Sequence, residues 1–284
     1  MDNNIIICDK KRFEEIKTRI ANSGNEKIHV VSDFDRTLTK AFYKEKKVNA
    51  VISLLRSGEY LVKDYALKAH SLFDKYHPIE IDSRVPMNEK KEKMQEWWEK
   101  SEELLIEFEL DKKTMKQCIK DAIKKDKLVF RGGAEEFFQI LKKENIPLII
   151  MSASLRYLIE EFMKQKKVYS SNVHVVANTF KFDKNGKAIK IEKIVHILNK
   201  NEIEIKDSSV YNNLLKRKNV ILLGDHLGDL GMIEGFDYDN LIKIGFLNEN
   251  VEDNLEYFKK AFDIVILGDG NFRYINELLE ELIS

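Results

Sequence analysis

Beyond residue 130, short apolar runs along the chain alternate with longer stretches in which apolar residues recur every three or four positions. Short runs rich in Val, Ile and Leu predict buried strands, and the longer spacing predicts amphipathic helices. With one earlier strand at 28–32, the predicted strands are 147–151, 173–177, 220–223, 241–244 and 263–266. Strands that alternate with helices in this way are typical of a parallel sheet with crossover helices.

The segments around these strands carry the helical pattern. In residues 9–23, Phe13, Ile16 and Ile20 fall on one side, which indicates a helix that covers one face of the sheet. A small hairpin is expected at 180–187, where Asn-Gly follows alternating residues. The other predicted helices are 134–143, 155–166, 191–199, 209–216, 250–259 and 274–282.

Residues from about 47 to 125 carry a charged helical pattern without any strand-like run of Val and Ile. Its apolar stripes are Leu61, Tyr65, Ala69, Leu72, Phe73 and Tyr76, and Met94, Trp97, Trp98, Leu104, Leu105 and Phe108. We therefore predict an α/β fold, with a Rossmann-like parallel sheet core that has helices on both faces in residues 1–40 and 126–284. An all-helical cap is inserted at 41–125.

Within the second stripe, Ser101 stands at an apolar position and is expected to face inward. An inward serine either bonds the carbonyl four residues earlier or contacts a ligand, and the sequence leaves both open. Trp97 and Trp98 are adjacent, so they point about 100 degrees apart on a helix. For them, core packing is favoured over contact with a flat ligand.

Charge and cysteine content narrow the class of protein. The 284 residues contain 48 Lys and Arg against 48 Asp and Glu, so no long-range field favours a nucleic acid polymer or a membrane surface. Cys8 and Cys118 form no C-x-x-C, which supports neither a zinc site nor a disulfide framework. The apolar run at 5–8 is too short for a signal peptide or a membrane span. We expect a cytoplasmic monomer that acts on a small molecule.

The predicted strand 28–32 leads directly into Asp33 and Asp35. Residues two apart on an extended strand point the same way, so both carboxylates are expected to converge beyond the sheet edge. Two like charges held close are costly unless a cation lies between them, and hard oxygen ligands suit Mg2+. The alternative is an Asp-rich turn that caps the next helix.

Two further strands end in polar residues at the same edge, where open parallel sheets bind their ligands. Ser152-Ala153-Ser154 offers a hydroxyl and backbone N–H groups for a phosphate, although Ser154 could instead cap the helix predicted from 155. After 220–223, Asp225 would complete the metal site, with helix capping as its alternative. Asp229 could hold a metal-bound water or orient another ligand.

Together, these segments resemble a known family. Asp33 to Leu38 (DFDRTL), the S-A-S loop and GDHLGDL are similar to motifs one, two and four of the haloacid dehalogenase-like hydrolases. Their order and spacing over about residues 28 to 266 resemble those of the cytosolic type III, or pyrimidine, 5′-nucleotidases. Ser154 stands where these enzymes often have glycine, and His226 stands where serine is usual.

This resemblance implies roles for the residues of the motifs. Asp33 would be the nucleophile, and Asp35 would be the general acid and then the base, with its pKa raised relative to that of Asp33. Asp225 would join Asp33 and the Asp35 carbonyl around Mg2+. Lys200 would be the lysine of the third motif; without the resemblance, it fits a lysine at a helix C-terminus.

The resemblance also implies how the substrate is held. Ser152 and the Ala153 backbone would bind phosphate, while Glu80 and Ser101 match the base-recognition positions of the cap. The expected activity is Mg2+-dependent hydrolysis of nucleoside 5′-monophosphates, with CMP and UMP favoured, because a carboxylate at 80 accepts hydrogen bonds from an exocyclic amine. Alternatives are a 7-methyl-GMP nucleotidase, a phosphatase for another small phosphomonoester, and a silent nucleotide-binding protein.

Overall fold

Strand β2 (Ile28–Ser32) lies in the middle of the eight-stranded sheet of the computed structural model, which describes residues 4–57, 60–82, 84–196, 200, 211–234 and 237–284. The sheet order is β1-β10-β9-β8-β2-β5-β6-β7. The six strands from β10 to β6 pair in parallel, and β1 and β7 pair antiparallel at the two edges. The other bounds are β1 (Ile5–Ile7), β5 (Leu148–Leu155), β6 (Val173–Phe182), β7 (Ala188–Lys193), β8 (Asn219–Gly224), β9 (Asn240–Leu247) and β10 (Ile264–Leu267).

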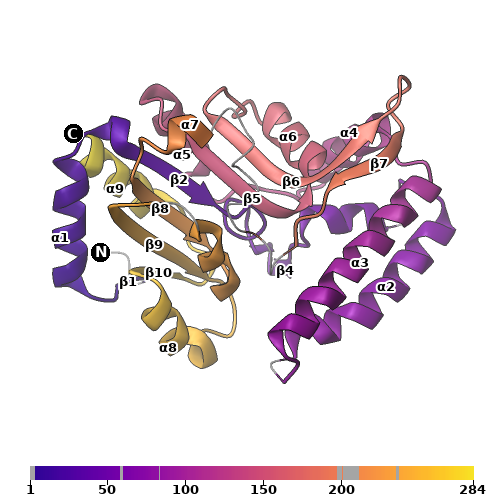
Figure 1. Ribbon diagram of the computed structural model, residues 1–284, viewed down its shortest axis with the longest axis horizontal. Helices are drawn as coiled ribbons and strands as arrows, with labels where there is room; N and C mark the ends of the chain where they lie inside the picture. The colour runs from indigo at the N-terminus through magenta and orange to yellow at the C-terminus, as the bar shows by residue number, and fades with distance from the viewer. Residues whose placement is uncertain (1–3, 58–59, 83, 197–199, 201–210, 235–236) are drawn as a thin grey trace.

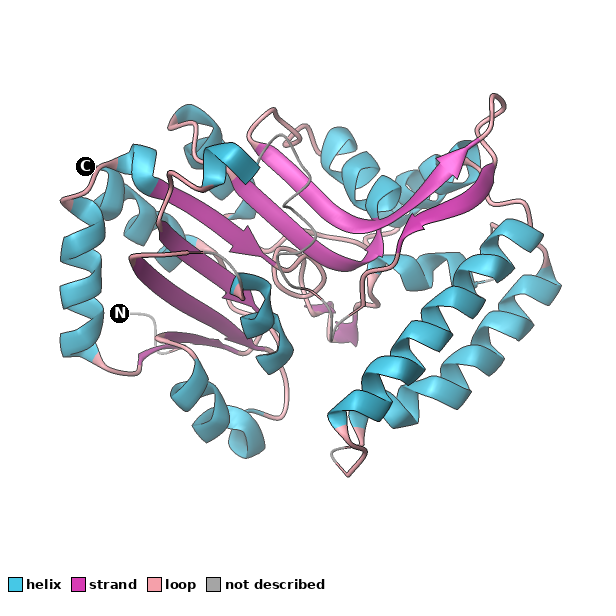
Figure 2. Cartoon of the chain, viewed as in Figure 1, coloured by secondary structure: helices cyan, strands magenta, loops and turns pink. Residues whose placement is uncertain are grey.

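Both faces of this sheet are covered, and its central strands β2 and β8 are buried at every position. In β2, Val30 belongs to the core cluster on one face and Val31 to the cluster on the other. Helices flank the strands on both sides (Figure 2). Their bounds are α1 (Lys10–Ala21), α5 (Ala134–Lys143), α6 (Arg156–Gln165), α7 (Tyr211–Leu214), α8 (Val251–Ala261) and α9 (Arg273–Ile283).

The predicted Rossmann-like parallel sheet is confirmed, and so are its six predicted strands and the hairpin, where Gly186 takes a φ of 85°. The helix predicted at 191–199 is wrong at its start. Residues 188–193 form β7, because their pairing with β6 outweighs a local helical pattern; residues 197–199 lie outside the described part of the chain. Of the helix predicted at 209–216, the structure describes α7, and 209–210 lie outside the described residues.

The segment between β2 and β5 contains most of the remaining helices. A two-stranded pair that the sequence pattern did not predict, β3 (Phe42–Tyr43) and β4 (Lys46–Lys47), is followed by a 3-10 segment at Val51–Ser57. Helices α2 (Lys63–Ile81) and α3 (Met87–Glu107) pack against each other and extend beyond β7 (Figure 1). Helix α4 (Lys112–Lys124) packs on α6 instead. Within the described residues, every helix lacks the length or the apolar character needed to cross a bilayer.

Candidate functional site

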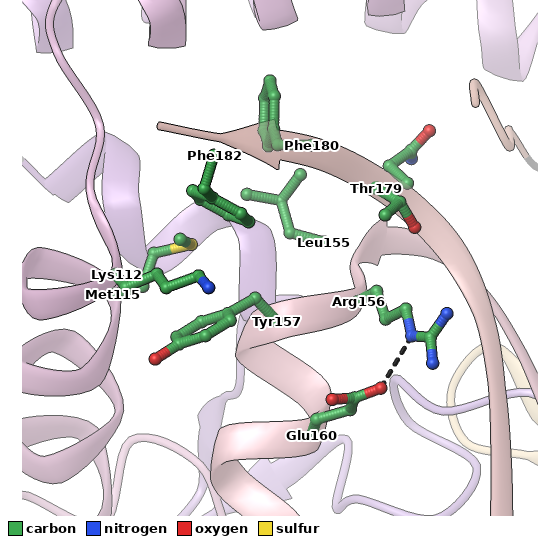
Figure 3. A pocket seen from close by; sticks show the side chains of 10 residues that line it. Lys112, Met115, Leu155, Arg156, Tyr157, Glu160, Thr179, Phe180 and Phe182 are labelled. Atoms are coloured by element: carbon green, nitrogen blue, oxygen red, sulfur yellow. Dashed lines mark hydrogen bonds and ion pairs between the residues drawn. The ribbon is translucent and has the colours of Figure 1, made fainter. Parts of the chain in front are cut away.

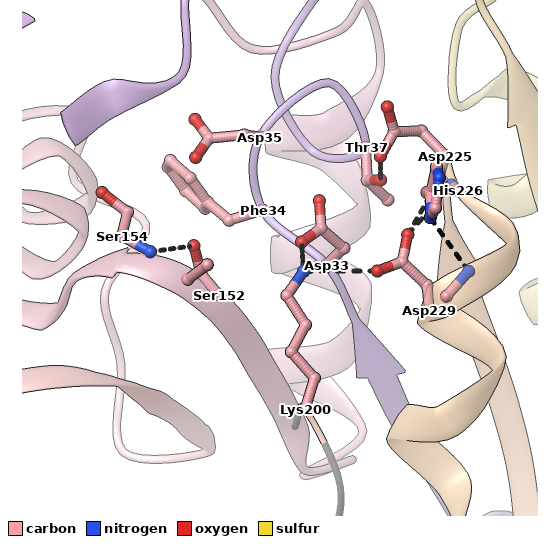
Figure 4. A network of polar contacts seen from close by, with 12 residues as sticks. Asp33, Phe34, Asp35, Thr37, Ser152, Ser154, Lys200, Asp225, His226 and Asp229 are labelled. Atoms are coloured by element: carbon pink, nitrogen blue, oxygen red, sulfur yellow. Dashed lines mark hydrogen bonds and ion pairs between the residues drawn. The ribbon is translucent and has the colours of Figure 1, made fainter. Parts of the chain in front are cut away.

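Three neighbouring strands deliver polar residues to one edge of the sheet (Figure 4). Asp33 follows β2, and its backbone N–H donates to the carbonyl of Leu223 in β8 at 3.0 Å. Asp225 comes directly after β8, and Ser152 lies near the end of β5 on the other side of β2. Parallel strands end at the same edge, so residues almost 200 positions apart in the sequence become neighbours.

The carboxylates of Asp33, Asp225 and Asp229 form a cluster in which each contributes an oxygen within 4.8 Å of the others. Burial raises the pKa of Asp33 well above its usual range, and burial together with the nearby Asp229 raises the pKa of Asp225 to about 7. Like charges this close and this buried are costly without a cation. Hard oxygens on a buried anionic cluster fit the preference of Mg2+.

Lys200 supplies the positive charge that the structure describes at this cluster. Its Nζ donates to Asp33 and, at 3.2 Å, to Asp229, and the residue is only 6% exposed. Burial alone would lower the pKa of Lys200, but the carboxylates of Asp229 and Asp33 raise it overall. Of the helix predicted at 191–199, residues 191–193 belong to β7 and 194–196 are not helical, and 197–199 lie outside the described residues.

Asp229 belongs to the cluster and also shapes the backbone beside it. Its Oδ2 accepts hydrogen bonds from the backbone N–H groups of Asp225 at 3.1 Å and His226 at 3.0 Å. The exposed His226 caps the 3-10 segment Leu227–Ile233, so the reading of Asp225 as a helix cap is wrong. A Cβ on Gly224 would lie 2.6 Å from the Asp229 Cβ, so glycine is needed for this close approach.

The Asp35 side chain does not converge with that of Asp33, which corrects the expectation from strand geometry. Its Oδ1 accepts a hydrogen bond from the backbone N–H of Val51 at 2.8 Å, and Figure 4 shows it directed away from Lys200. The chain leaves the extended conformation after β2, and Arg36 has a φ of 61°, so the two-residue repeat of a strand ends there. Of Asp35, only its backbone carbonyl remains for a metal. Burial raises the pKa of Asp35 to about 6, but it raises the pKa of Asp33 as well, so burial does not set Asp35 above Asp33 as was expected.

The serine loop is a continuation of β5. The strand runs to Leu155 and α6 begins at the next residue, so Ser154 is not the helix cap. The Ser154 N–H donates to Ser152 Oγ at 3.1 Å, and the buried Ser154 hydroxyl has no hydrogen-bond partner among the described residues. The Ala153 carbonyl accepts from Asn178 Nδ2 at 2.8 Å. These contacts fix the backbone beside Asp33.

A cavity lies between α2, α3 and the 3-10 segment that precedes them. Ser101 lines it, as its inward position predicts, and its hydroxyl makes no hydrogen bond within the described part of the chain, so bonding back to the carbonyl is wrong. Trp97 stacks on Tyr76, with ring centroids 6.0 Å apart, while it also borders the cavity. The lining consists of Ile52, Arg56, Tyr65, Ala69, Trp97, Trp98, Ser101, Leu104 and Leu105.

Two charged residues of this region differ in where the structure places them. Glu80 is not among the lining residues, and its carboxylate lies 3.0 Å from His77 Nδ1. Arg56 does line the cavity, with its guanidinium 4.7 Å from the centre of the Phe73 ring. Within the described residues, Arg56 makes no side-chain hydrogen bond or ion pair; burial lowers its pKa, and the nearby Tyr65 and Glu80 partly offset this effect. Arg56 was not predicted as a site residue; its only signal in the sequence is a cation that ends the apolar run from 51.

Another cavity, between α4, α6 and β6, contains none of the predicted site residues (Figure 3). Its charged groups already have partners. Arg156 pairs with Glu160 at 2.6 Å, and Lys112 Nζ lies 4.6 Å from the centre of the Phe182 ring. The groups suited to chemistry are therefore those around Asp33.

Comparisons with known proteins agree with this geometry. Residues 36–283 match the family model described as pyrimidine 5′-nucleotidase (UMPH-1). A Xenopus laevis protein named 7-methylguanosine phosphate-specific 5′-nucleotidase A is 34% identical over 274 residues, covering 96% of this chain and 93% of its own length. The Homo sapiens protein of that name is 32% identical over 285 residues, covering 100% and 94%.

Solved structures give the same result. A crystal structure of cytosolic 5′-nucleotidase IIIB bound to cytidine is similar with a TM-score of 0.90 and 30% identity, covering 99% of this chain and 94% of that one. A HAD family hydrolase from Salmonella enterica serovar Typhi has a TM-score of 0.54 at 14% identity, covering 90% and 72%. The second likeness is one of fold alone.

Proposed function

The chain belongs to the pyrimidine 5′-nucleotidase family and is a 5′-nucleotidase, and from that premise we propose that it hydrolyses nucleoside 5′-monophosphates with Mg2+, with CMP and UMP favoured. The observation that carries the proposal is the Lys200 ammonium bound to Asp33 and Asp229 beside Asp225. In this proposal, residues 1–40 and 126–284 form the catalytic core, and 41–125 form the cap that holds the nucleoside.

In the first half of the reaction, a carboxylate oxygen of Asp33 attacks the phosphorus. The bond from phosphorus to the nucleoside 5′ oxygen breaks, and an aspartyl phosphate forms. Asp35 donates its proton to the departing 5′ oxygen, which a carboxyl with a pKa raised to about 6 can do near neutral pH. The bond from Val51 N–H holds that carboxyl away from the metal cluster, where it would be ionised.

In the second half, water attacks the phosphorus of the aspartyl phosphate, and Asp35 takes the proton of that water. Phosphate leaves and Asp33 is restored. Both halves build negative charge on the phosphoryl oxygens, which the Lys200 ammonium, the Ser152 hydroxyl and the Ala153 N–H would offset. Asp33, Asp225 and the Asp35 carbonyl would hold Mg2+, which supplies further charge stabilisation when bound, while Asp229 orients the surrounding groups.

The preference for CMP and UMP over 7-methyl-GMP follows from Arg56. A guanidinium that lines the cavity beside Ser101 can donate to the carbonyl and N3 of cytosine, or to the carbonyls of uracil. The methylated guanine ring is a cation, so the Arg56 guanidinium in the same cavity repels it. Glu80 would accept from the exocyclic amine of cytosine once substrate closes the cap.

A second candidate is a preference for 7-methyl-GMP. Two features favour it, namely the tryptophans and tyrosine that line the cavity and the names of the relatives from Xenopus laevis and Homo sapiens. A cationic ring stacks well on Trp97 or Trp98, and the Glu80 carboxylate would offset its charge. The balance between Arg56 and these groups decides between the two substrates.

Phosphate release from CMP, UMP, 7-methyl-GMP and phosphoserine, with and without Mg2+, tests the proposal. We expect Mg2+-dependent release from the nucleotides, with the largest kcat/KM for CMP. If no nucleotide releases phosphate, the nucleotidase proposal fails. Release from phosphoserine or p-nitrophenyl phosphate alone would instead support a phosphatase for another small phosphomonoester. Nucleotide binding without any turnover would support the silent binding protein.

Variants of the cap separate the two nucleotide preferences. Arg56→Met should lower kcat/KM for CMP and raise it for 7-methyl-GMP, so that the ratio shifts about tenfold toward the cationic base. Among the described residues, the exposed cap residue Arg84 pairs with Asp82 alone, so Arg84→Met is the matched control. Glu80→Ala should reduce turnover of nucleotides far more than that of p-nitrophenyl phosphate. An unchanged CMP to 7-methyl-GMP ratio in Arg56→Met would refute the role of this arginine.

Location and assembly complete the proposal. We propose that the protein is cytoplasmic, which is supported by the name putative cytosolic 5′-nucleotidase 3 of a Caenorhabditis elegans relative that is 30% identical over 291 residues, and that it is a monomer. Light scattering at the concentrations used for kinetics tests the monomer. A mass twice the 33.3 kDa of the chain would contradict it.

A further inference from the structure

Arg131 is a fully buried arginine that belongs to none of the sequence motifs. Its Nε donates to the carbonyl of Thr37 at 2.8 Å, and its Nη2 donates to the carbonyl of Arg36. These are the two peptide carbonyls that directly follow Asp35. An arginine fork fixes two carbonyls at once, and a buried cation is retained only where many acceptors surround it.

The other edge of the guanidinium is held by a segment near the C-terminus. Nη1 donates to Asp269 Oδ1 at 3.0 Å and to the carbonyl of Gly270 at 2.8 Å. The guanidinium also lies 4.2 Å from the centre of the Phe246 ring. In turn, the Asp269 carboxylate accepts from the backbone N–H of Ala41 at 2.7 Å. The pair of Arg131 and Asp269 therefore ties the backbone after Asp35 at two places.

Asn248 links this arrangement to the metal cluster. It follows β9, and its Oδ1 accepts from Arg131 Nη2 at 2.6 Å. Its Nδ2 donates to the carbonyl of Arg36 at 3.1 Å and lies 3.5 Å from Asp225 Oδ2. One amide thus joins the arginine, the backbone beyond Asp35 and a carboxylate of the cluster.

The backbone that these three side chains hold is in an unfavourable conformation. Arg36 has a φ of 61°, which a residue with a Cβ adopts only where its surroundings impose it. This turn directs the Asp35 carboxylate to Val51 N–H and not to the cluster around Asp33. The carbonyls of Arg36 and Thr37 accept hydrogen bonds from Arg131 and Asn248, and among the described residues no other group donates to them.

The same place is where the chain passes into and out of the segment 41–125. The Arg131 N–H donates to the carbonyl of Leu38 at 3.0 Å, and the Lys40 N–H donates to the carbonyl of Val129 at 2.9 Å. The outgoing and returning chains therefore pair, with Arg131 at the junction. A change in its side chain would reach both the turn after Asp35 and the base of the helical segment.

We propose that Arg131, Asn248 and Asp269 are positioning residues for the phosphoryl transfer. They hold the turn at residues 36–37 so that Asp33 faces the phosphorus and Asp35 faces the leaving oxygen, although none of the three touches the substrate. The inference rests on the proposed nucleotidase reaction. It predicts that loosening the turn slows the chemical steps and leaves binding of the nucleoside intact, since the cap cavity shares no residue with this set.

Asn248→Ala is the main test, because it removes bonds from the turn without leaving a buried charge unpaired. We expect kcat for CMP to fall about tenfold or more, which corresponds to the loss of interactions worth one good hydrogen bond, while KM changes less than about threefold. Asn248→Asp retains an acceptor for Arg131 and loses the donor to the Arg36 carbonyl. Asn254→Ala is the matched control, since among the described residues the Asn254 side chain on α8 bonds the carbonyl of Asn250 alone.

Arg131→Lys and Asp269→Asn extend the test to the ion pair. A lysine keeps the positive charge beside Asp269, but its single ammonium cannot span the carbonyls of Arg36, Thr37 and Gly270 together. In both variants, we expect kcat to fall by a larger factor than the factor by which KM changes. Melting temperatures are measured alongside; if Arg131→Lys does not fold, the Asn248 variants decide.

A purely structural role predicts a different outcome. If folded Asn248→Ala and Asp269→Asn keep the parental kcat, or if kcat falls only in proportion to the unfolded fraction, the inference is overturned. The assays are repeated with p-nitrophenyl phosphate, which needs no base contact. A parent that turns over this compound but no nucleotide defeats the proposed substrate class, and the comparison of kcat between parent and variants still tests the positioning role.

Discussion

Lys200 donates a hydrogen bond to the carboxylate of Asp33, a residue 167 positions earlier in the chain. The same ammonium reaches Asp229 at 3.2 Å, so one cation serves two buried carboxylates. We expect Lys200→Met to lower kcat for CMP by about a hundredfold to a thousandfold, because charge building on the phosphoryl oxygens loses a preorganised cation. Steady-state kinetics at saturating Mg2+ measures this loss.

A control separates this effect from a general loss of positive charge. Lys218 forms an ion pair with Asp237 that is exposed to solvent, so Lys218→Met should retain the parental kcat. Circular dichroism confirms that both variants are folded. A Lys200→Met enzyme with more than about a tenth of the parental kcat would contradict the role of Lys200.

Asp35→Asn tests the general acid. The amide oxygen of asparagine still accepts the bond from Val51 N–H, so the fold should be retained. We expect kcat for CMP to fall by about a hundredfold to ten-thousandfold, and by much less for p-nitrophenyl phosphate, whose leaving group needs little protonation. An equal loss with both substrates would contradict proton donation by Asp35.

The pH dependence follows from the same carboxyl. Burial raises the pKa of Asp35 to about 6, so its proton is present below pH 6 and is lost as the pH rises through that value. At saturating Mg2+, which would keep Asp33 and Asp225 ionised, the single-turnover rate of nucleoside release from CMP should therefore decline above about pH 6 in the parent. In Asp35→Asn, this decline should be absent, and rapid-quench measurements from pH 5 to 8 can show it.

The sequence was informative where the chemistry lies at the ends of parallel strands. Asp33 and Asp225 follow buried apolar runs, and neighbouring parallel strands must end at one edge, so their meeting could be predicted. The orientation of Asp35 could not. It depends on the turn at Arg36, which Arg131 holds from almost a hundred residues away in the chain.

The other sequence-based predictions that were wrong also failed because of contacts between residues distant in the chain. Residues 191–193 belong to a predicted helix, but antiparallel pairing of β7 with β6 makes them part of a strand. Ser154 is a good helix cap by residue type, yet β5 continues through it to Leu155. Arg56 was missed because only the packing of α2 against α3 turns the end of an apolar run into the wall of a cavity.

Gly224→Ala tests the close approach behind the carboxylate cluster. An added Cβ would lie 2.6 Å from the Asp229 Cβ, which is too close for two carbon atoms. Asp229 is buried, so it cannot move away without disturbing its neighbours. We expect Asp229 to shift away from Lys200, with a loss of kcat of about tenfold or more and of about 1–3 kcal/mol in the free energy of unfolding. Gly268→Ala is not a matched control, because Gly268 has a positive φ.

Gly132→Ala provides the control for that variant. At Gly132 the nearest atom to an added Cβ is 3.6 Å away, an ordinary contact distance. Denaturant unfolding and kinetics should show little change in Gly132→Ala. If Gly224→Ala retains the parental stability and kcat, the backbone there moves freely, and the proposed constraint on Asp229 is wrong.

Glu102 on α3 gives a test of stability that is independent of the reaction. The residue is 1% exposed, and its Oε2 has no hydrogen-bond partner among the described residues. Burial, with a smaller effect of Glu99, raises the pKa of Glu102 to about 8. A carboxyl whose pKa is higher in the folded state stabilises the fold fully below its unfolded pKa, and this stabilisation is lost as the pH rises through the folded value.

The parent should therefore lose stability between about pH 4.5 and pH 8 through this group, whereas Glu102→Gln has no proton to lose. We expect the two proteins to have similar free energies of unfolding at pH 4.5, and the variant to be more stable by about 1–3 kcal/mol at pH 8. Urea unfolding across this range measures the difference, in which effects of other groups cancel. The exposed neighbour Glu103 provides the control Glu103→Gln, for which the difference from the parent should stay near zero at every pH. A difference for Glu102→Gln that is constant with pH would mean that Glu102 is ionised in the folded protein.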